Sequence, residues 1–238
     1  MNFLLKLFQK INFIISYIFA NQINEKEIIS KIASHENPLV FDIGSNLGEY
    51  SKFVSKTLKN NNLVVHSFEP IKKLLNTQKI KYGILEKQNV AVSDFSGQVK
   101  FFERNVSSTS SIYENDYINQ NNIKSEYSVR QIEISKYILN NNIFLIDILK
   151  IDTEGNDLNI LKNVCKILNE VDIKLFKIEI LFQNNNNFSM ENFATVMQVL
   201  RDKKFSFIGF ANSKYNNNVM FHFDAYFVNN KYLNKIYE

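Results

Sequence analysis

Acidic side chains follow the apolar runs of this sequence, close to the point where each run ends. Asp42 follows "PLVF", Glu69 follows "LVVHSF", and the pair Asp152 and Glu154 follows "IFLIDILKI". Glu179 lies near the end of a further run, "IKLFKIEILF". Carboxylates can accept hydrogen bonds, act as general bases or bind hard cations. The sequence therefore points to chemistry that uses oxygen acceptors.

Thiol chemistry and nucleic-acid binding find little support in the composition. The single cysteine, Cys165, lies in an apolar periodic stretch typical of a buried structural residue, and the three histidines show no ligand spacing. The net charge is +4, but the lysines are scattered, so no nucleic-acid partner is expected. With 45% hydrophobic and 13% aromatic residues, the 238-residue chain can build a real core.

The elements that would position the acids can be predicted from hydrophobic periodicity. Strands are expected over residues 38–44, 63–70, 89–94, 97–103, 128–135, 143–152, 173–182, 205–210 and 219–228. Helices are expected over residues 25–34, 47–58, 71–83, 156–168 and 189–204, and a polar surface loop over 105–125. Alternating strands and helices predict an α/β fold with a mostly parallel sheet, helices on both faces and an antiparallel edge hairpin.

In such a sheet, ligands bind beyond the carboxyl ends of the strands. The residues expected there are rich in carboxylates and include no lysine or arginine, whereas a pyrophosphate site needs positive charge. The spacing Gly44-x-x-x-Gly48 also differs from the dinucleotide fingerprint. This chemistry suits S-adenosylmethionine, which carries a sulfonium, an ammonium group and a ribose diol. Glu69 would accept both ribose hydroxyls, the glycines would permit close approach, and Asp42 would hold the ammonium group.

Residues 1–20 form a separate amphipathic pattern. Leu4, Leu7, Ile11, Ile14 and Ile18 recur at helical spacing, but intervening lysines interrupt the run too often for a membrane-spanning helix or a signal peptide. We expect a helix that packs on the domain or on a second subunit of a homodimer. The alternative is a basic helix that contacts a membrane surface. The expected location is the cytoplasm, or the inner membrane surface if the helix binds lipid.

Several motifs together resemble the FkbM family of S-adenosylmethionine-dependent methyltransferases. They are "VFDIGSNLGEY", "SFEP", "NVAVSD", "SSTSS", "IDILKIDTEGND" and "KIEILF", in the family's order over residues 38–182. The resemblance implies a Rossmann-like class I methyltransferase fold, with a seven-stranded sheet whose last inserted strand is antiparallel. It also implies methyl transfer, often to a hydroxyl of a sugar, glycolipid or polyketide-like metabolite. The domain division expected is a helical appendage over 1–36 and a methyltransferase domain over 37–238.

The chain departs from the family pattern at a few positions. Ser45 stands where alanine is usual, and Thr77 or Gln78 lies where an asparagine is often found. Asn156 and Asp157 follow Gly155 where alanine and glutamate are common. These departures leave the cofactor site intact and bear mainly on the acceptor.

Two sets of site residues follow from these patterns. The expected cofactor-binding residues are Asp42, Gly44, Asn46, Gly48, Glu49, Glu69, Pro70, Ala91, Ser93, Asp94 and Asp152. The expected catalytic residues are Asp152, Glu154 and Glu179. The three acids could be a base with its supports or an oxygen-ligand site for Mg²⁺, and the sequence does not by itself predict a metal. One of them could instead cap the helix beginning near Asn156.

Three functions compete at this stage. The leading hypothesis is an O-methyltransferase that acts on a small-molecule or glycan acceptor, such as a saccharide, a glycolipid or a related metabolite. The second is a nicotinamide-dependent oxidoreductase, which the glycine spacing disfavours. The third is a non-catalytic module that retains the fold, which the acids at several strand ends disfavour.

Overall fold

A seven-stranded sheet forms the centre of the molecule. The computed structural model describes residues 22–114, 123–181, 190–216 and 219–237. The strand order is β3-β2-β1-β7-β8-β10-β9. Its strands are β1 (Leu39–Ile43), β2 (Val64–Phe68), β3 (Ile84–Gln88), β7 (Leu145–Ile151), β8 (Asp172–Leu181), β9 (Phe205–Asn216) and β10 (Val219–Asn229). β10 is antiparallel to both of its neighbours, whereas β1 is parallel to β2 and β7. The predicted mostly parallel sheet with an antiparallel edge hairpin is confirmed.

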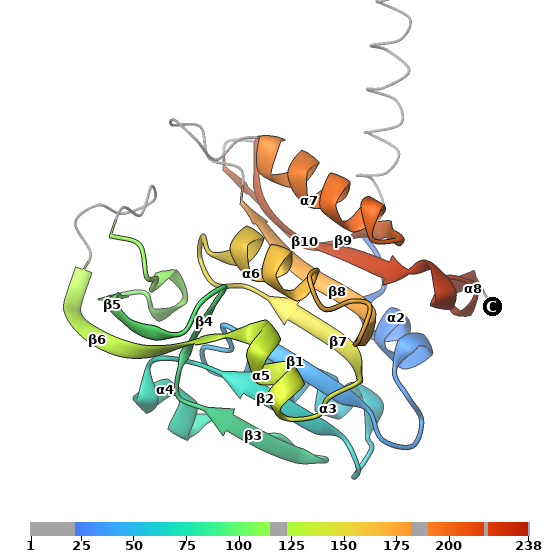
Figure 1. The fold of residues 1–238 in the computed structure, drawn as a ribbon, viewed down its shortest axis with the longest axis horizontal. Coiled ribbons are helices and arrows are strands. Elements are labelled where there is room, and N and C mark those ends of the chain that lie inside the picture. The colour runs from blue at the N-terminus through green and yellow to red at the C-terminus, as the bar shows by residue number, and fades with distance from the viewer. Residues whose placement is uncertain (1–21, 115–122, 182–189, 217–218, 238) are drawn as a thin grey trace, which may run out of the picture.

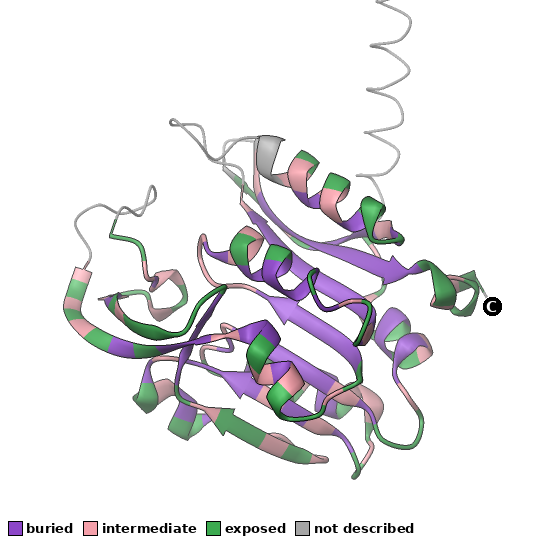
Figure 2. Cartoon of the chain, in the orientation of Figure 1, coloured by how far each residue is buried: buried purple, intermediate pink, exposed green. Residues whose placement is uncertain are grey.

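Helices cover both faces of this sheet (Figure 1). One face is covered by α5 (Ile134–Asn140), α6 (Asp157–Val164) and α7 (Met190–Asp202). The other is covered by α2 (Glu25–Ile32), α3 (Glu49–Leu58) and α8 (Asn234–Tyr237). Figure 2 shows buried strands between helices that are exposed on their outer sides. This two-sided cover explains why the central strands read as continuous apolar runs.

A second, three-stranded sheet was not expected as a separate unit. It has the order β4-β6-β5, and its strands are β4 (Ala91–Ser93), β5 (Gly97–Arg104) and β6 (Ile123–Glu133). Together with the residue before α4 (Lys72–Thr77), it encloses a small core of Ile71, Ala91, Phe101 and Val129. This sheet stands beside the carboxyl ends of β1 and β2 in Figure 1.

The prediction that residues 89–94 form the third strand of the main sheet is therefore wrong. That place belongs to β3, which pairs with β2 through partners such as Val65 and Leu85. β3 lies at the sheet edge with exposed, polar side chains, so it lacks the apolar run that marks a buried strand. The helix expected over 71–83 ends already at Thr77, because the chain then becomes extended and leads into β3.

The helix α5 was not predicted. A strand was expected over residues 128–135, which overlaps the start of this helix. The strand ends at Glu133, and Ile134 and Ile138 then pack into the core at helical spacing. The short helix has two buried isoleucines that also suit a strand, so the pattern alone favoured the wrong element.

The described part of the predicted appendage packs directly on the sheet. Asn24 caps α2 by accepting a hydrogen bond from the Glu27 amide, and Ile29 and Ile32 are fully buried. The Ile23 amide donates to the Phe210 carbonyl at 3.0 Å. The amphipathic helix predicted for residues 1–20 lies outside the described residues. Within the described ranges, we find no helix with the length and apolarity needed to span a bilayer.

Candidate active site

A cavity of about 900 Å³ opens at the carboxyl ends of β1, β2, β7 and β8. Its walls come from the turn after β1, the end of β2, β4, the loop after β7, and the strands β8 and β10. One end is lined by the apolar residues Phe68, Val90, Ala91 and Val92, with Glu69 and Asn46 beside them. The other end is lined by charged residues of β7, β8 and β10. The site thus lies where the sheet topology places ligands.

The turn after β1 approaches the neighbouring strand so closely that only glycine fits at its first position. Gly44 has a φ of +71°, and a Cβ there would lie 1.7 Å from the carbonyl oxygen of Asp152. Gly48 caps α3 with a φ of +73°, and its Cβ would meet the Gln78 side chain at 2.9 Å. Gly44 lines the cavity, whereas Gly48 does not. Gly48 was expected beside the cofactor, and here it packs against Gln78.

A buried hydrogen-bond network supports this turn from below. The Ser67 hydroxyl donates to the Gln78 Oε1 at 2.5 Å, and Gln78 Nε2 donates to the Ser45 Oγ at 2.8 Å and to the Asn46 carbonyl at 2.7 Å. Ser45 and Gln78 are two of the positions where the sequence departs from the FkbM pattern. Because they bind each other, the two departures form one polar network that fixes the turn.

Glu69 lies at the end of β2, as predicted. Its Oε1 accepts from the Ile71 amide at 2.7 Å, and its Oε2 accepts from the Asn46 amide at 2.9 Å. Burial raises the pKa of this carboxyl to about 7, although the two backbone donors oppose that shift. Each oxygen of a carboxylate has two lone-pair sites, so both can accept a further hydrogen bond from a ligand.

Asp42 is placed differently from the expectation that it contacts the cofactor. It is fully buried and absent from the cavity wall. Its Oδ2 accepts from the Ser51 amide at 3.1 Å and from the Ser51 hydroxyl at 2.6 Å, and its Oδ1 pairs with Lys150 Nζ at 3.0 Å. Asp42 therefore joins β1 to α3 and β7 behind the wall.

The remaining predicted cofactor residues divide into two groups. Asn46, Glu49, Pro70 and Ala91 line the cavity together with Gly44, Glu69 and Asp152. Ser93 and Asp94 do not line it. Ser93 is buried against Asn156, whose Nδ2 donates to the Ser93 Oγ at 3.1 Å, and Asp94 is exposed. Both were expected at the end of a main-sheet strand, and β4 belongs to the other sheet.

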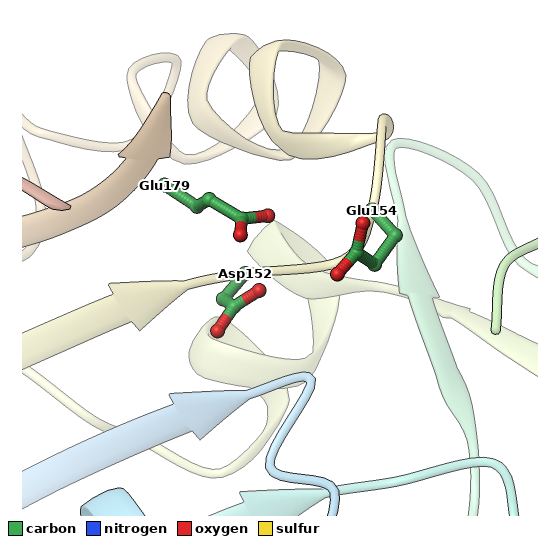
Figure 3. Close-up of side chains that lie close together, drawn as sticks. All are labelled: Asp152, Glu154 and Glu179. Carbon is green, nitrogen blue, oxygen red and sulfur yellow. The ribbon is translucent and has the colours of Figure 1, made fainter. Parts of the chain in front are cut away.

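The three predicted catalytic acids converge, as Figure 3 shows. Asp152 follows β7, Glu154 lies in the loop after it, and Glu179 comes from β8. One carboxylate oxygen from each lies within 4.8 Å of the others. Asp157, the next acid in the chain, instead accepts from the Thr153 and Gly155 amides and so shapes the loop.

The surroundings of Asp152 and Glu179 shift the pKa values of these two acids in opposite directions. Burial opposes ionisation of Asp152, but Lys150, at 3.2 Å, holds the pKa of that carboxyl below its usual range. Burial and repulsion from Asp152 and Glu154 raise the pKa of Glu179 well above its usual range. Neighbouring acids whose pKa values are shifted apart, beside one cavity, are typical of sites that move or hold protons.

Two buried lysines in the site overturn the expectation of strand ends without cations. Lys150 on β7 and Lys177 on β8 both line the cavity. Lys150 binds Asp42 and Asp152, whereas Lys177 binds Asp224 at 2.5 Å and Glu25 at 3.4 Å. The signal that could have revealed them is a period of two within the apolar strands, which puts Lys150 with Asp152 and Lys177 with Glu179 on the same face.

His222 and Asp224 on β10 repeat this period-two pattern and also line the cavity. The His222 Nδ1 lies 3.1 Å from the Glu179 Oε1. Burial lowers the pKa of His222, which favours the neutral imidazole. The sequence pattern gave His222 no role, because its partner Glu179 lies far away in the chain and becomes a neighbour only through strand pairing.

The serine-rich segment at 107–111 forms part of the cavity rim. The Ser107 hydroxyl donates to the Asn46 Oδ1 at 3.0 Å, and the Ser111 hydroxyl donates to the Glu154 carbonyl at 2.9 Å. Ser107, Ser108 and Ser110 line the cavity. This segment is therefore joined both to the turn after β1 and to the loop that carries the acids.

Comparison with known proteins agrees with this architecture. The family model for the methyltransferase FkbM domain matches residues 42–207. The FkbM methyltransferase structure from Methylobacillus flagellatus superposes with a TM-score of 0.50 and 13% identity, over 80% of this chain and 44% of its own. The chain thus spans less than half the length of that relative.

Two further structures are more distant, and both are methyltransferases. The precorrin-6y C5,15-methyltransferase from Geobacter metallireducens has a TM-score of 0.41 and 11% identity, over 84% of this chain and 86% of its own. A SAM-dependent methyltransferase from Aquifex aeolicus has a TM-score of 0.40 and 12% identity, over 86% and 89%. No curated protein matches the chain. The match at 42–207 covers more than half of the sequence and includes most of the acids described above, so the chain belongs to the FkbM methyltransferase family.

Proposed function

We propose that this chain is an S-adenosylmethionine-dependent O-methyltransferase acting on a hydroxyl of a saccharide, a glycolipid or a related metabolite. S-adenosylmethionine supplies an activated methyl group on a positively charged sulfur. The chain's own residues have to bind this donor, hold an acceptor oxygen in line with it and manage one proton.

The observation that carries the donor assignment is Glu69. Its carboxylate is fixed by two backbone amides at the end of β2, and it borders the apolar end of the cavity. A fixed carboxylate with free lone pairs matches a ribose diol, and the adjoining wall of Val90, Ala91 and Val92 matches an adenine ring. Gly44 and Asn46 complete that end. These residues fit S-adenosylmethionine without requiring a positively charged phosphate cradle.

Asp152, Glu154 and Glu179 support the assignment of the transfer end. Asp152 and Glu154 follow β7, and Glu179 lies near the end of β8. β7 pairs with β1, whose turn carries Gly44, and with β8. An acceptor hydroxyl that forms a bond to the methyl carbon loses its proton, and a carboxylate beside it can take that proton. We assign this role to the acid group as a whole, with His222 as the neighbour of Glu179.

The polar half of the cavity supports a hydroxyl-rich acceptor. Glu25, Asn212, Lys214 and Asp224 line it, and the serines at 107, 108 and 110 form the rim. Carboxylates, amides and hydroxyls in one wall provide both donors and acceptors, which is what several sugar hydroxyls require. An aliphatic acceptor would cover this polar wall without forming hydrogen bonds to it.

Two measurements test the proposal. Calorimetry should show binding of S-adenosylmethionine and no binding of NAD, the ligand of the competing oxidoreductase hypothesis. Transfer is then followed with methyl-labelled donor and separated glycan, lipid, protein and nucleic-acid fractions from the source cells. Label in a glycan or glycolipid product supports the acceptor class. Donor binding with label only in protein or nucleic acid would contradict it.

A further inference from the structure

The two buried lysines of the site pair with acids other than Glu179. Asp42 and Asp152 share Lys150, and Asp224 and Glu25 share Lys177. The Glu179 Oε1 lies 3.1 Å from the His222 Nδ1. Each lysine is thus occupied by two other acids, and neither forms an ion pair with Glu179.

The second oxygen of Glu179 gives an independent indication that a ligand is missing. The Glu179 side chain is 5% exposed, and its Oε2 is buried without any hydrogen-bond partner in the described structure. Figure 3 shows this carboxylate directed at Asp152 and Glu154. Burying a carboxylate oxygen without a partner costs free energy, so proteins supply such oxygens with donors or with metal ions.

We propose that Asp152, Glu154 and Glu179 form a binding site for one divalent cation of the Mg²⁺ class. Their three oxygens lie within 4.8 Å of one another, a span that a six-coordinate ion with oxygen ligands can bridge. The site goes beyond the proposed function, since methyl transfer from a sulfonium does not itself require a metal.

The ligand chemistry selects the type of ion. An all-carboxylate set favours hard cations over zinc or copper, which prefer imidazole and thiolate. The three acids supply only part of an octahedral shell, and the cavity beside them leaves space for other oxygens. Mg²⁺ typically keeps several waters and takes one or two carboxylates with substrate oxygens, so an acceptor hydroxyl could complete the shell.

Metal coordination also leaves the proposed proton acceptor in place. Each carboxylate has two oxygens, so binding the ion through one leaves the other available to the acceptor. A cation beside the acceptor oxygen would also lower the pKa of that hydroxyl. The site would therefore assist the same reaction.

The test needs neither acceptor nor turnover. The full-length chain is freed of metal with a chelator and titrated with Mn²⁺, and free Mn²⁺ is measured by electron paramagnetic resonance. We expect one Mn²⁺ per chain, displaced by Mg²⁺. Glu154→Gln and Glu179→Gln should each weaken binding about tenfold or more, because each removes one anionic ligand. The matched control is Glu170→Gln, which changes an exposed glutamate outside the cavity in the same way.

Circular dichroism melting verifies that each variant is folded. Glu154 is half-exposed, so its variant keeps the fold even if the buried Glu179 variant does not. Absence of bound Mn²⁺ at about millimolar concentration, or equal binding by wild type and Glu154→Gln, would overturn the site. Calorimetry with S-adenosylmethionine in metal-free buffer separates the two proposals. Donor binding without Mn²⁺ binding refutes only the cation site, and the reverse result refutes only the proposed function.

Discussion

Folding and donor binding favour different protonation states of Glu69. Its carboxyl is 5% exposed and accepts two backbone hydrogen bonds, and its pKa is raised to about 7 mainly by burial. Between its ordinary value of 4.5 and about 7, the folded chain keeps a proton that the unfolded chain releases. The contribution of Glu69 to stability therefore falls as the pH rises through that window. Binding two ribose hydroxyls requires the ionised form.

This conflict predicts a pH dependence of donor binding. The dissociation constant for S-adenosylmethionine should fall about tenfold between about pH 6 and about pH 8, because the carboxylate becomes available as the pH passes about 7. Glu69→Gln should bind more weakly and lose this dependence. Glu86→Gln, which changes an exposed glutamate of β3, should retain it. Calorimetry across the range measures each case. If Glu69→Gln keeps the full slope, another group controls binding.

At the scale of elements, buried lysines join strands at both ends of the sheet. Lys150 and Lys177 lie at the carboxyl ends, in the cavity wall. Lys174 lies near the start of β8, where its Nζ binds Asp147 Oδ1 at 2.6 Å. Asp147 also accepts from the Ser34 and Leu39 amides, at 2.8 Å each. This second pair therefore fixes the end of α2 and the start of β1 to the sheet, away from the cavity.

The Lys174 pair should contribute to stability and not to donor binding. Lys174→Met should lower the free energy of unfolding by about 3–5 kcal/mol, because it leaves the charge of fully buried Asp147 without a cation. The control Lys166→Met, at an exposed position, should change it by less than about 0.5 kcal/mol. Urea denaturation measures both. In the folded fraction, affinity for S-adenosylmethionine should match wild type, since Lys174 does not line the cavity. A stability loss under about 1 kcal/mol would show that the three remaining donors, the Ser34 and Leu39 amides and the Ser34 hydroxyl, suffice for Asp147.

At the scale of the whole molecule, the sequence was enough to predict a central sheet covered by helices. It was not enough to predict which strands pair with each other. β1, β7 and β8 were predicted because burial on both faces makes them continuous apolar runs. β3 was missed, because an edge strand with exposed side chains is held mainly by backbone hydrogen bonds that leave no mark on composition. The division into two sheets depends on which backbone pairs with which, and neither β4 nor β6 carries that information locally.

In the candidate site, too, some residue positions could be predicted from the sequence and others could not. Gly44, Glu69, Asp152, Glu154 and Glu179 could be predicted because they lie at or just after the carboxyl ends of strands, and those ends share one edge of the sheet. The positions of Asp42 and His222 could not, because each depends on a partner more than 40 residues away, Lys150 or Glu179. Motifs locate the turn that carries a residue, while strand pairing decides whether its side chain faces the cavity or the interior.

The segment just after the N-terminal twenty residues contributes to the cavity wall. Glu25 of α2 lines the cavity, and its Oε1 accepts from the Tyr226 hydroxyl and pairs with Lys177. Ile23 is joined to β9 through the Phe210 carbonyl. Deleting residues 1–20 preserves all of these contacts. Affinity for S-adenosylmethionine should therefore stay within about twofold of wild type.

A matched deletion of residues 1–25 removes Ile23 and Glu25 as well. It should weaken donor binding and lower the melting temperature, because it leaves Lys177 with one acid fewer and removes the Asn24 cap and the first residue of α2. Sedimentation of the shorter deletion tests the predicted dimer, and co-sedimentation with anionic vesicles tests the predicted membrane contact. Loss of either property with donor binding unchanged would assign residues 1–20 to that role. A folded 1–20 deletion that no longer binds S-adenosylmethionine would place part of the donor site before Gln22 and contradict the cavity boundary drawn here.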